Sequence, residues 1–178
     1  MKKFIIALFA IGFPLFGISQ SAFDKFEDSD RIGSVTISKG MLKIAAEMMG
    51  NHGDKETQEF VDLAKNLDGI KIFMSEDEGA SADMQATMKK YVKKSRLEEL
   101  MKVKDGDTNL KFYIKNGKDE DHVTELLMFV TGLEDDKGRK SNIETVLLSM
   151  TGDIDLNKVG SLTEKMSLHK GLKKASRN

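Results

Sequence analysis

The sequence predicts an α+β domain, a two-layer sandwich in which helices pack on one face of a mainly antiparallel sheet. In its first half, apolar residues at helical spacing alternate with isolated strand-like segments. In its second half, four strand-like segments follow one another. Strands in succession, with helices grouped elsewhere, are typical of this class. No repeat or linker interrupts the pattern, so we expect one domain over residues 22–166.

A strand and two helices are predicted after a short polar lead-in. Residues 31–38 are rich in β-branched side chains and are bounded by glycines, which favours a strand. Apolar residues at helical spacing predict helices over 39–50 and 55–67. These helices are expected to form a hairpin that Asp68 and Gly69 close.

A second strand over 70–74 precedes a third helix, which is expected to start at Ser81 and to carry lysines on its outer face. Methionines on the predicted helix faces fit a core, because this flexible side chain fills irregular gaps. The alternative is a groove for apolar ligands or varied peptides. We expect these methionines to fill the core: Met41, Met48, Met49, Met84 and Met88.

The four later segments, 97–104, 109–115, 122–131 and 142–151, are interpreted as strands. The Asp105-Gly106 pair between the first two favours a tight turn. The last two segments are apolar on nearly every residue, which fits central strands that are buried on both faces. Amphipathic helices are the alternative for these two segments.

The first 21 residues have the features of a cleavable signal peptide. Lys2 and Lys3 precede an apolar run, residues 4–17, that is shorter than the roughly 20 residues of a transmembrane helix. Small residues permit cleavage after Ser19 or after Ser21. We therefore expect a periplasmic or secreted protein with no integral membrane segment after cleavage; an uncleaved anchor is the alternative.

Composition narrows the classes of function. The chain has no cysteine, which excludes disulfides, thiolate metal sites and a cysteine-linked lipoprotein anchor. Its net charge of −1 gives no electrostatic attraction to nucleic acid, so no nucleic-acid partner is expected. There is no tryptophan to form a platform for carbohydrate.

Sequence motifs point to no catalytic residue. The chain lacks a Gly-x-Ser-x-Gly elbow, a phosphate-binding loop and a dinucleotide fingerprint, so no cofactor is expected. The spacing of its three histidines is not that of a zinc site. Carboxylates are numerous, but only the fold could bring two of them together as in a glycosidase.

The best lead for a metal is an acidic segment near the end of the domain. Oxygen-bearing side chains stand at positions one, three, five and twelve of a calcium loop of the EF-hand type: Asp153, Asp155, Asn157 and Glu164. The sixth position, where such a loop needs glycine, is Lys158, whose charge opposes a cation. We therefore favour a structural explanation, in which Asp155 caps a final helix over 156–166, and keep calcium as the weaker candidate.

Several strand ends and helix starts resemble a secreted bacterial family catalogued as domain of unknown function 4252. The segments are VTISK at 35–39, LDGIKI at 67–72, LEELMKV at 97–103, LKFY at 110–113 and TGDIDL at 151–156. The resemblance covers nearly the whole chain after the signal peptide. It implies a single domain in the cell envelope and no particular activity.

The sequence therefore predicts a signal peptide over 1–21, an α+β domain over 22–166 and a basic tail over 167–178. Our leading hypothesis is a non-catalytic envelope domain that binds a protein partner or an apolar ligand. The alternatives are a hydrolase whose carboxylates meet only in the fold, and a calcium-stabilised surface module.

Overall fold

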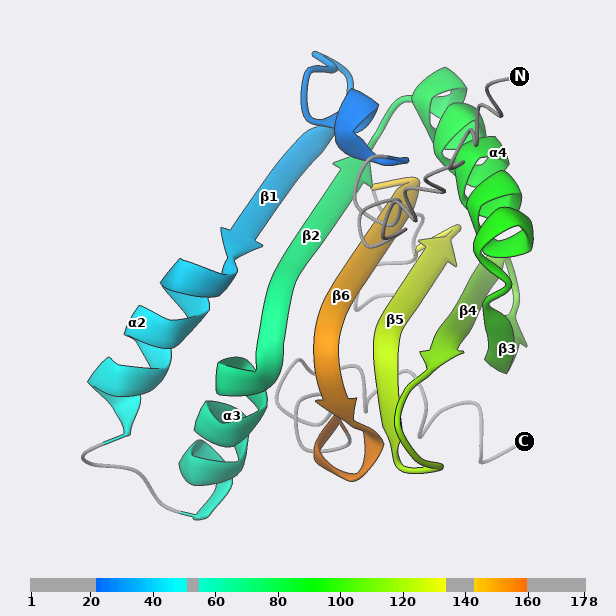
Figure 1. Ribbon diagram of the computed structural model, residues 1–178. Helices are drawn as coiled ribbons and strands as arrows, with labels where there is room; N and C mark the ends of the chain where they lie inside the picture. The colour runs from blue at the N-terminus through cyan, green and yellow to red at the C-terminus, as the bar shows by residue number, and fades with distance from the viewer. Residues whose placement is uncertain (1–21, 51–54, 134–142, 160–178) are drawn as a thin grey trace, which may run out of the picture.

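The protein, as a computed structural model, forms a six-stranded antiparallel sheet with the order β1-β2-β6-β5-β4-β3 (Figure 1). The structure describes residues 22–50, 55–133 and 143–159. Its elements, in chain order, are η1 (Asp24–Phe26), β1 (Gly33–Ser38), α2 (Lys39–Met49), α3 (Lys55–Asn66), β2 (Leu67–Ser75), α4 (Glu78–Ser95), β3 (Glu98–Asp105), β4 (Thr108–Asn116), β5 (His122–Thr131) and β6 (Thr145–Asp155). The α+β class and the antiparallel sheet are confirmed.

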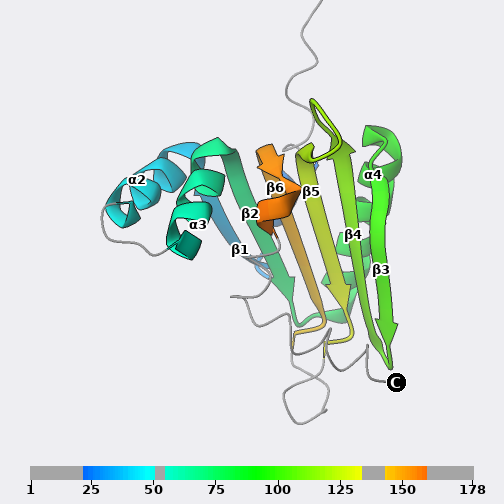
Figure 2. The same cartoon turned by 90° about the horizontal axis from the view of Figure 1, so that it is seen from below.

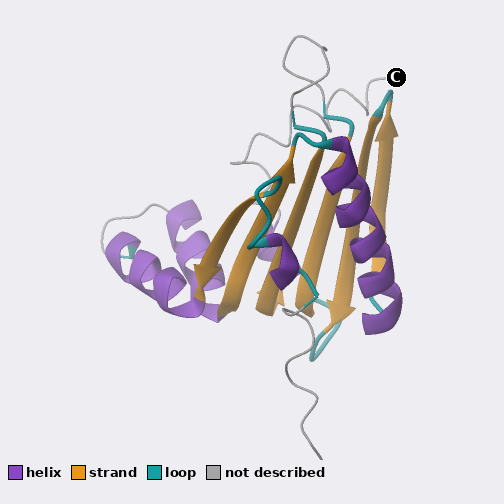
Figure 3. Ribbon diagram, turned by 90° about the horizontal axis from the view of Figure 1, so that it is seen from above, coloured by secondary structure: helices purple, strands orange, loops and turns teal. Residues whose placement is uncertain are grey.

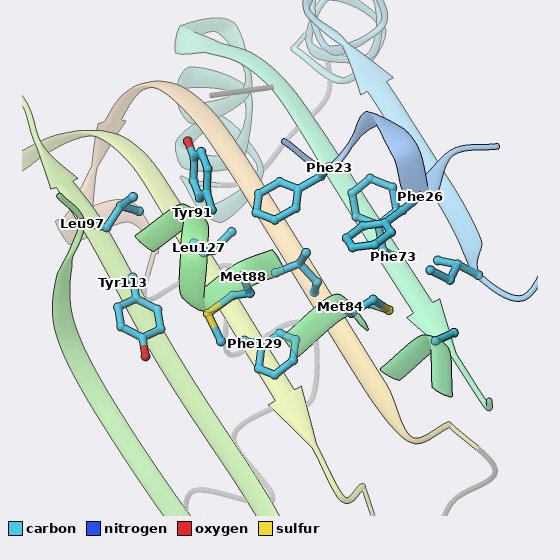
Figure 4. Close-up of a cluster of buried hydrophobic side chains, with 13 residues drawn as sticks. Phe23, Phe26, Phe73, Met84, Met88, Tyr91, Leu97, Tyr113, Leu127 and Phe129 are labelled. Atoms are coloured by element: carbon cyan, nitrogen blue, oxygen red, sulfur yellow. The ribbon is translucent and has the colours of Figure 1, made fainter. Parts of the chain in front are cut away.

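Helix α4 links β2 to β3, which lies at the far edge of the sheet, so it crosses one whole face on the way. The 3-10 helix η1 lies on the same face (Figure 3). Between these helices and the strands is the first core cluster, drawn in Figure 4. Its larger members are Phe23, Phe26, Phe73, Met84, Met88, Tyr91, Tyr113, Leu127, Phe129 and Leu147.

The start of α4 differs from the expected position. The helix begins at Glu78 and not at Ser81, because Asp77 acts as its N-cap. The Asp77 Oδ1 atom accepts a hydrogen bond of 2.7 Å from the backbone N–H of Ala80. Arg96, with a φ of 54°, ends the helix in the left-handed conformation that is common at helix C-termini.

Strands β5 and β6 are apolar on both sides because both faces of the sheet centre are buried. In β5, Leu127 and Phe129 join the first cluster under α4. Leu126, Met128 and Val130 point the other way, into a second cluster. The strand interpretation is confirmed for residues 122–131 and, in the second segment, from Thr145 onward, and β6 extends to Asp155.

The hairpin of α2 and α3 packs near the β1 edge of the sheet. Ala46, Val61 and Ala64 are buried between the two helices. Leu42 and Leu63 belong to the second cluster, on the face opposite α4. The hairpin therefore adds helical cover at a corner of that face (Figure 2).

The sequence suggested that Asp68 and Gly69 close the helix hairpin. They belong instead to β2. The strand starts directly at Leu67, and its pairing with β6 shifts register between Leu67 and Gly69. Opposite this shift, Gly152 has a φ of 141°. A Cβ atom there would lie 2.4 Å from the Asn66 carbonyl oxygen, so the close approach of the two chains requires glycine.

Ion pairs attach η1 to the sheet. The Lys71 side chain of β2 is 13% exposed and lies 2.6 Å from Asp24 Oδ1 and 2.8 Å from Glu27 Oε1. Hydrogen bonds from Lys71 and Thr36 lower the pKa of Glu27. Buried charges need such partners, and here both carboxylates come from the segment that carries the core residue Phe26.

The methionines divide into two groups, so the expectation that all of them fill the core is wrong. Met84 and Met88 are buried beneath α4. Met41, Met48 and Met49 of α2 are exposed, and Met48 leaves 78% of its surface in solvent. The two groups share helical spacing in the sequence, but only the α4 residues face the sheet.

Replacing each of two helical methionines by alanine tests this division. Met84→Ala removes a side chain that is fully buried and should lower the free energy of unfolding by about 2–5 kcal/mol. The matched variant, Met48→Ala, should change it by less than about 0.5 kcal/mol. Urea denaturation measures both, and equal losses would contradict the structure.

Candidate functional site

Exposed apolar side chains gather along β1 and α2. Val35 of β1 and Met41, Ile44, Met48 and Met49 of α2 are large, apolar and exposed. Met41 and Ile44 leave 58% and 54% of their surfaces in solvent. We call these five residues the β1–α2 surface.

The local sequence makes strand and helix continuous. β1 is the terminal strand of the sheet and, among the described strands, pairs with β2 alone. α2 begins immediately after it, since the Ser38 hydroxyl accepts a hydrogen bond from the backbone N–H of Met41 at 3.4 Å. Ser38 is thus the N-cap of α2. The edge of the sheet and the helix therefore form one strip (Figure 1).

Helix α2 has apolar residues on more than one side. Its buried residues, Leu42 and Ala46, face the sheet and α3. Met41, Ile44 and Met48 follow the i, i+3, i+7 spacing of a second stripe, and that stripe is exposed. No described element covers this stripe (Figure 2).

Charged side chains border the β1–α2 surface. Lys39, at the start of α2, pairs with Asp68 of β2 at 2.8 Å. Lys43 and Glu47 are exposed farther along the helix. An apolar centre within a polar border is the usual anatomy of a protein interface. Methionine adds adaptability, because its unbranched side chain fits varied partners.

Three of the four calcium candidates, Asp153, Asp155 and Asn157, lie in the part of the chain that the structure describes. Asp153 Oδ2 lies 2.7 Å from the Lys118 ammonium. Asp155 Oδ1 accepts a hydrogen bond from the backbone N–H of Asn157 at 2.9 Å, at the start of a helical turn. Glu164 lies outside the described residues. Among the described residues, no group of three acidic, histidine or cysteine side chains could hold a metal ion.

Glu125 is the buried carboxyl group beneath α4. It lies on β5, is 2% exposed, and its Oε2 atom accepts a hydrogen bond of 2.8 Å from the Tyr91 hydroxyl. Its Oε1 atom is buried without a hydrogen-bond partner. Burial raises the pKa of Glu125, although the Tyr91 hydrogen bond and the charge of Lys115 act in the opposite direction.

A hydrolase would need a second carboxylate facing Glu125 in an open pocket. The group that faces Glu125 is the Tyr91 hydroxyl, inside the first core cluster. The described pocket, between α4 and strands β3 to β5, contains no carboxylate in its lining. Neither the surroundings of Glu125 nor the lining of this pocket thus supplies the pair of carboxylates that the hydrolase hypothesis needs.

Comparison with known proteins places the chain in a family. Residues 26–162 match the family model of a domain of unknown function, DUF4252. The chain belongs to the DUF4252 family. No curated protein and no solved structure matches it. The DUF4252 match spans every strand of the sheet, as the resemblance in the sequence implied, and assigns no activity.

No helix in the described part of this DUF4252 chain is long and apolar enough to span a bilayer. The β1–α2 surface was not expected from the sequence, because the methionines of α2 were expected to fill the core. The sequence did contain a signal for this surface. Apolar residues occur on two sides of a helix of only 11 residues, whereas packing against one core requires them on one side.

The raised pKa of Glu125 predicts a pH dependence. The unfolded chain loses this proton near the ordinary value of 4.5, whereas the folded protein keeps it to higher pH. The folded state therefore binds more protons just above pH 4.5, and the free energy of unfolding falls as pH rises through this window. The glutamine side chain of the Glu125→Gln variant does not titrate, so this variant should lack the pH-dependent contribution of position 125 to the free energy of unfolding.

Urea denaturation of wild type and Glu125→Gln at a series of pH values measures the effect. The stability of wild type relative to the variant should decline above pH 4.5 and level off once the carboxyl ionises in the folded protein. Thr124→Ser, at an exposed position of β5, is the control and should give a constant difference, because neither side chain titrates. A constant difference for Glu125→Gln as well would contradict the assignment.

Proposed function

We propose that this DUF4252 protein is a non-catalytic domain of the cell envelope that binds a protein partner through the β1–α2 surface. The observation that carries the proposal is the stripe of exposed Met41, Ile44 and Met48 beside the terminal strand of the sheet. Contiguous exposed apolar side chains with a polar border mark interaction sites on folded proteins.

The geometry favours a protein over a small apolar ligand. Small ligands bind in concave pockets that bury most of their surface, whereas the exposed side of α2 is the convex surface of a helix. A protein can cover such a strip with apolar side chains of its own. It can also pair with the outer edge of β1, which presents backbone groups that β2 does not use.

The location in the envelope rests on the beginning of the sequence. Lys2 and Lys3 and the apolar run that follows have the order of a secretory signal, and small residues at Ser19 and Ser21 provide cleavage sites. N-terminal sequencing of the protein from the envelope fraction should find Gln20 or Ala22 as the first residue. Recovery of the intact N-terminus from cells would contradict this part of the proposal.

Site-specific photo-crosslinking in the source cells tests the partner surface. A photoreactive side chain at position 48 should form a discrete crosslinked product, because Met48 is the most exposed residue of the stripe. The same side chain at the exposed Lys90, on α4, is the matched control and should not form that product. Mass spectrometry identifies the partner, and a product of twice the chain mass would identify a second copy.

Adding Ile44→Glu should reduce the product from position 48 at least about tenfold, because a charge would then be buried in an apolar interface. Ile44 is exposed, so the variant should unfold at the same urea concentration as wild type within error. Identical products at positions 48 and 90, or a product that Ile44→Glu leaves unchanged, would overturn the proposal.

A further inference from the structure

A pocket opens at the edge of the sheet opposite β1, where α4 meets three strands. Its volume is about 190 Å³. Helix α4 contributes Gln85 and Lys89, and strand β3 contributes Lys102. Such a pocket is smaller than the roughly 300 Å³ or more of sites for drug-sized ligands, so it suits a small chemical group.

Positive charge converges on this pocket from three elements. Lys89 comes from α4, Lys102 from β3 and Lys111 from β4. The lining contains no carboxylate. None of these lysines forms an ion pair with a described residue.

The sheet register brings two of these charges face to face. Lys102 and Lys111 are direct partners in the β3–β4 ladder. They lie on the same side of the sheet as Tyr113, which belongs to the cluster under α4. Like charges directly opposite one another are destabilising, and a bound anion would convert this repulsion into attraction.

Neutral donors complete the lining. The Lys89 ammonium donates to Gln85 Oε1 at 3.2 Å, which holds the lysine beside the pocket. Asn109 uses one N–H of its amide on the Asp107 carbonyl at 3.1 Å, so the second N–H is available. Thr131 adds a hydroxyl group. The apolar part of the lining consists of Met88 and Phe129, two buried side chains of the first core cluster (Figure 4).

We infer that this pocket binds a phosphate group, either as free phosphate or as part of a lipid headgroup. Ammonium groups have three donors and no acceptor, and a phosphate offers several acceptor oxygens and more than one negative charge. Three lysines around a space of this size match that chemistry better than a neutral ligand or a singly charged carboxylate. The site lies at the opposite edge of the sheet from the β1–α2 surface and does not depend on the proposed partner.

Titration of the purified protein with inorganic phosphate, followed by amide NMR, tests the inference. Saturable shifts should appear at Lys102, Lys111 and Thr131, and rising ionic strength should weaken them. The triple variant Lys89→Gln, Lys102→Gln, Lys111→Gln should bind at least about tenfold more weakly, because charge-assisted hydrogen bonds are lost.

A variant with the same change in charge is the control: Lys90→Gln, Lys93→Gln, Lys94→Gln, all exposed on α4 and outside the pocket lining. It should bind phosphate within about twofold of wild type. Circular dichroism checks that both variants fold. Absence of saturable shifts at the pocket, or an equal loss in both variants, would overturn the inference.

Vesicles of phosphatidylcholine, with and without phosphatidic acid, distinguish the two sources of phosphate. Binding that requires phosphatidic acid, and that only the pocket variant loses, assigns a lipid headgroup to the site. Binding of inorganic phosphate without binding to either vesicle assigns the free anion. Vesicle binding that the pocket variant retains, together with no response to phosphate, would refute the site.

Discussion

The packing of α4 across the sheet is the constraint on which the rest of the structure depends. Phe23, Phe73 and Tyr91 form its aromatic centre, with the Phe23 and Tyr91 rings edge to face at 4.9 Å. This contact buries one face of strands whose sequences are apolar on both sides, and it holds η1 in place together with the ion pairs of Lys71. Strands β2 and β3 follow one another in the sequence but lie far apart in the sheet, and α4 connects them. β3 therefore forms one edge of the sheet, and β1 forms the other.

The two proposed binding regions follow from these two edges. At one edge, β1 runs directly into α2, and the helix has more apolar residues than α3 and the sheet can cover. At the other edge, the middle of α4 lies above the strands, and lysines from α4, β3 and β4 line the pocket between them. Among the described residues, the core beneath α4 contains one buried carboxyl group, Glu125, whose partner is a tyrosine hydroxyl and not a second carboxylate.

Much of this fold could be predicted from the sequence, because periodicity reports which residues are buried. The alternation in β4 and the continuous apolar runs of β5 and β6 predicted strands and even central positions. The periodicity of apolar residues could not show which elements lie against one another in space. Met48 and Met84 both lie among apolar residues at helical spacing in the sequence. Only the path of α4 across the sheet places Met84, and not Met48, against the strands. Likewise, Lys89 and Lys102 are unremarkable in sequence, and only the register that pairs Lys102 with Lys111 beneath α4 brings them together.

If a partner binds as proposed, the β1–α2 surface is bare in the isolated protein and covered in the cell. Methionine oxidation by dilute peroxide, read by mass spectrometry, measures it, because the oxidation rate follows exposure. In the purified protein, Met41 and Met48 should oxidise rapidly and Met84 slowly. In intact cells, Met41 and Met48 should become protected, while the exposed Met101 of β3 keeps its rate. Rapid oxidation of Met41 and Met48 in both settings would contradict a partner at this surface, and slow oxidation in the purified protein would contradict the exposed surface itself.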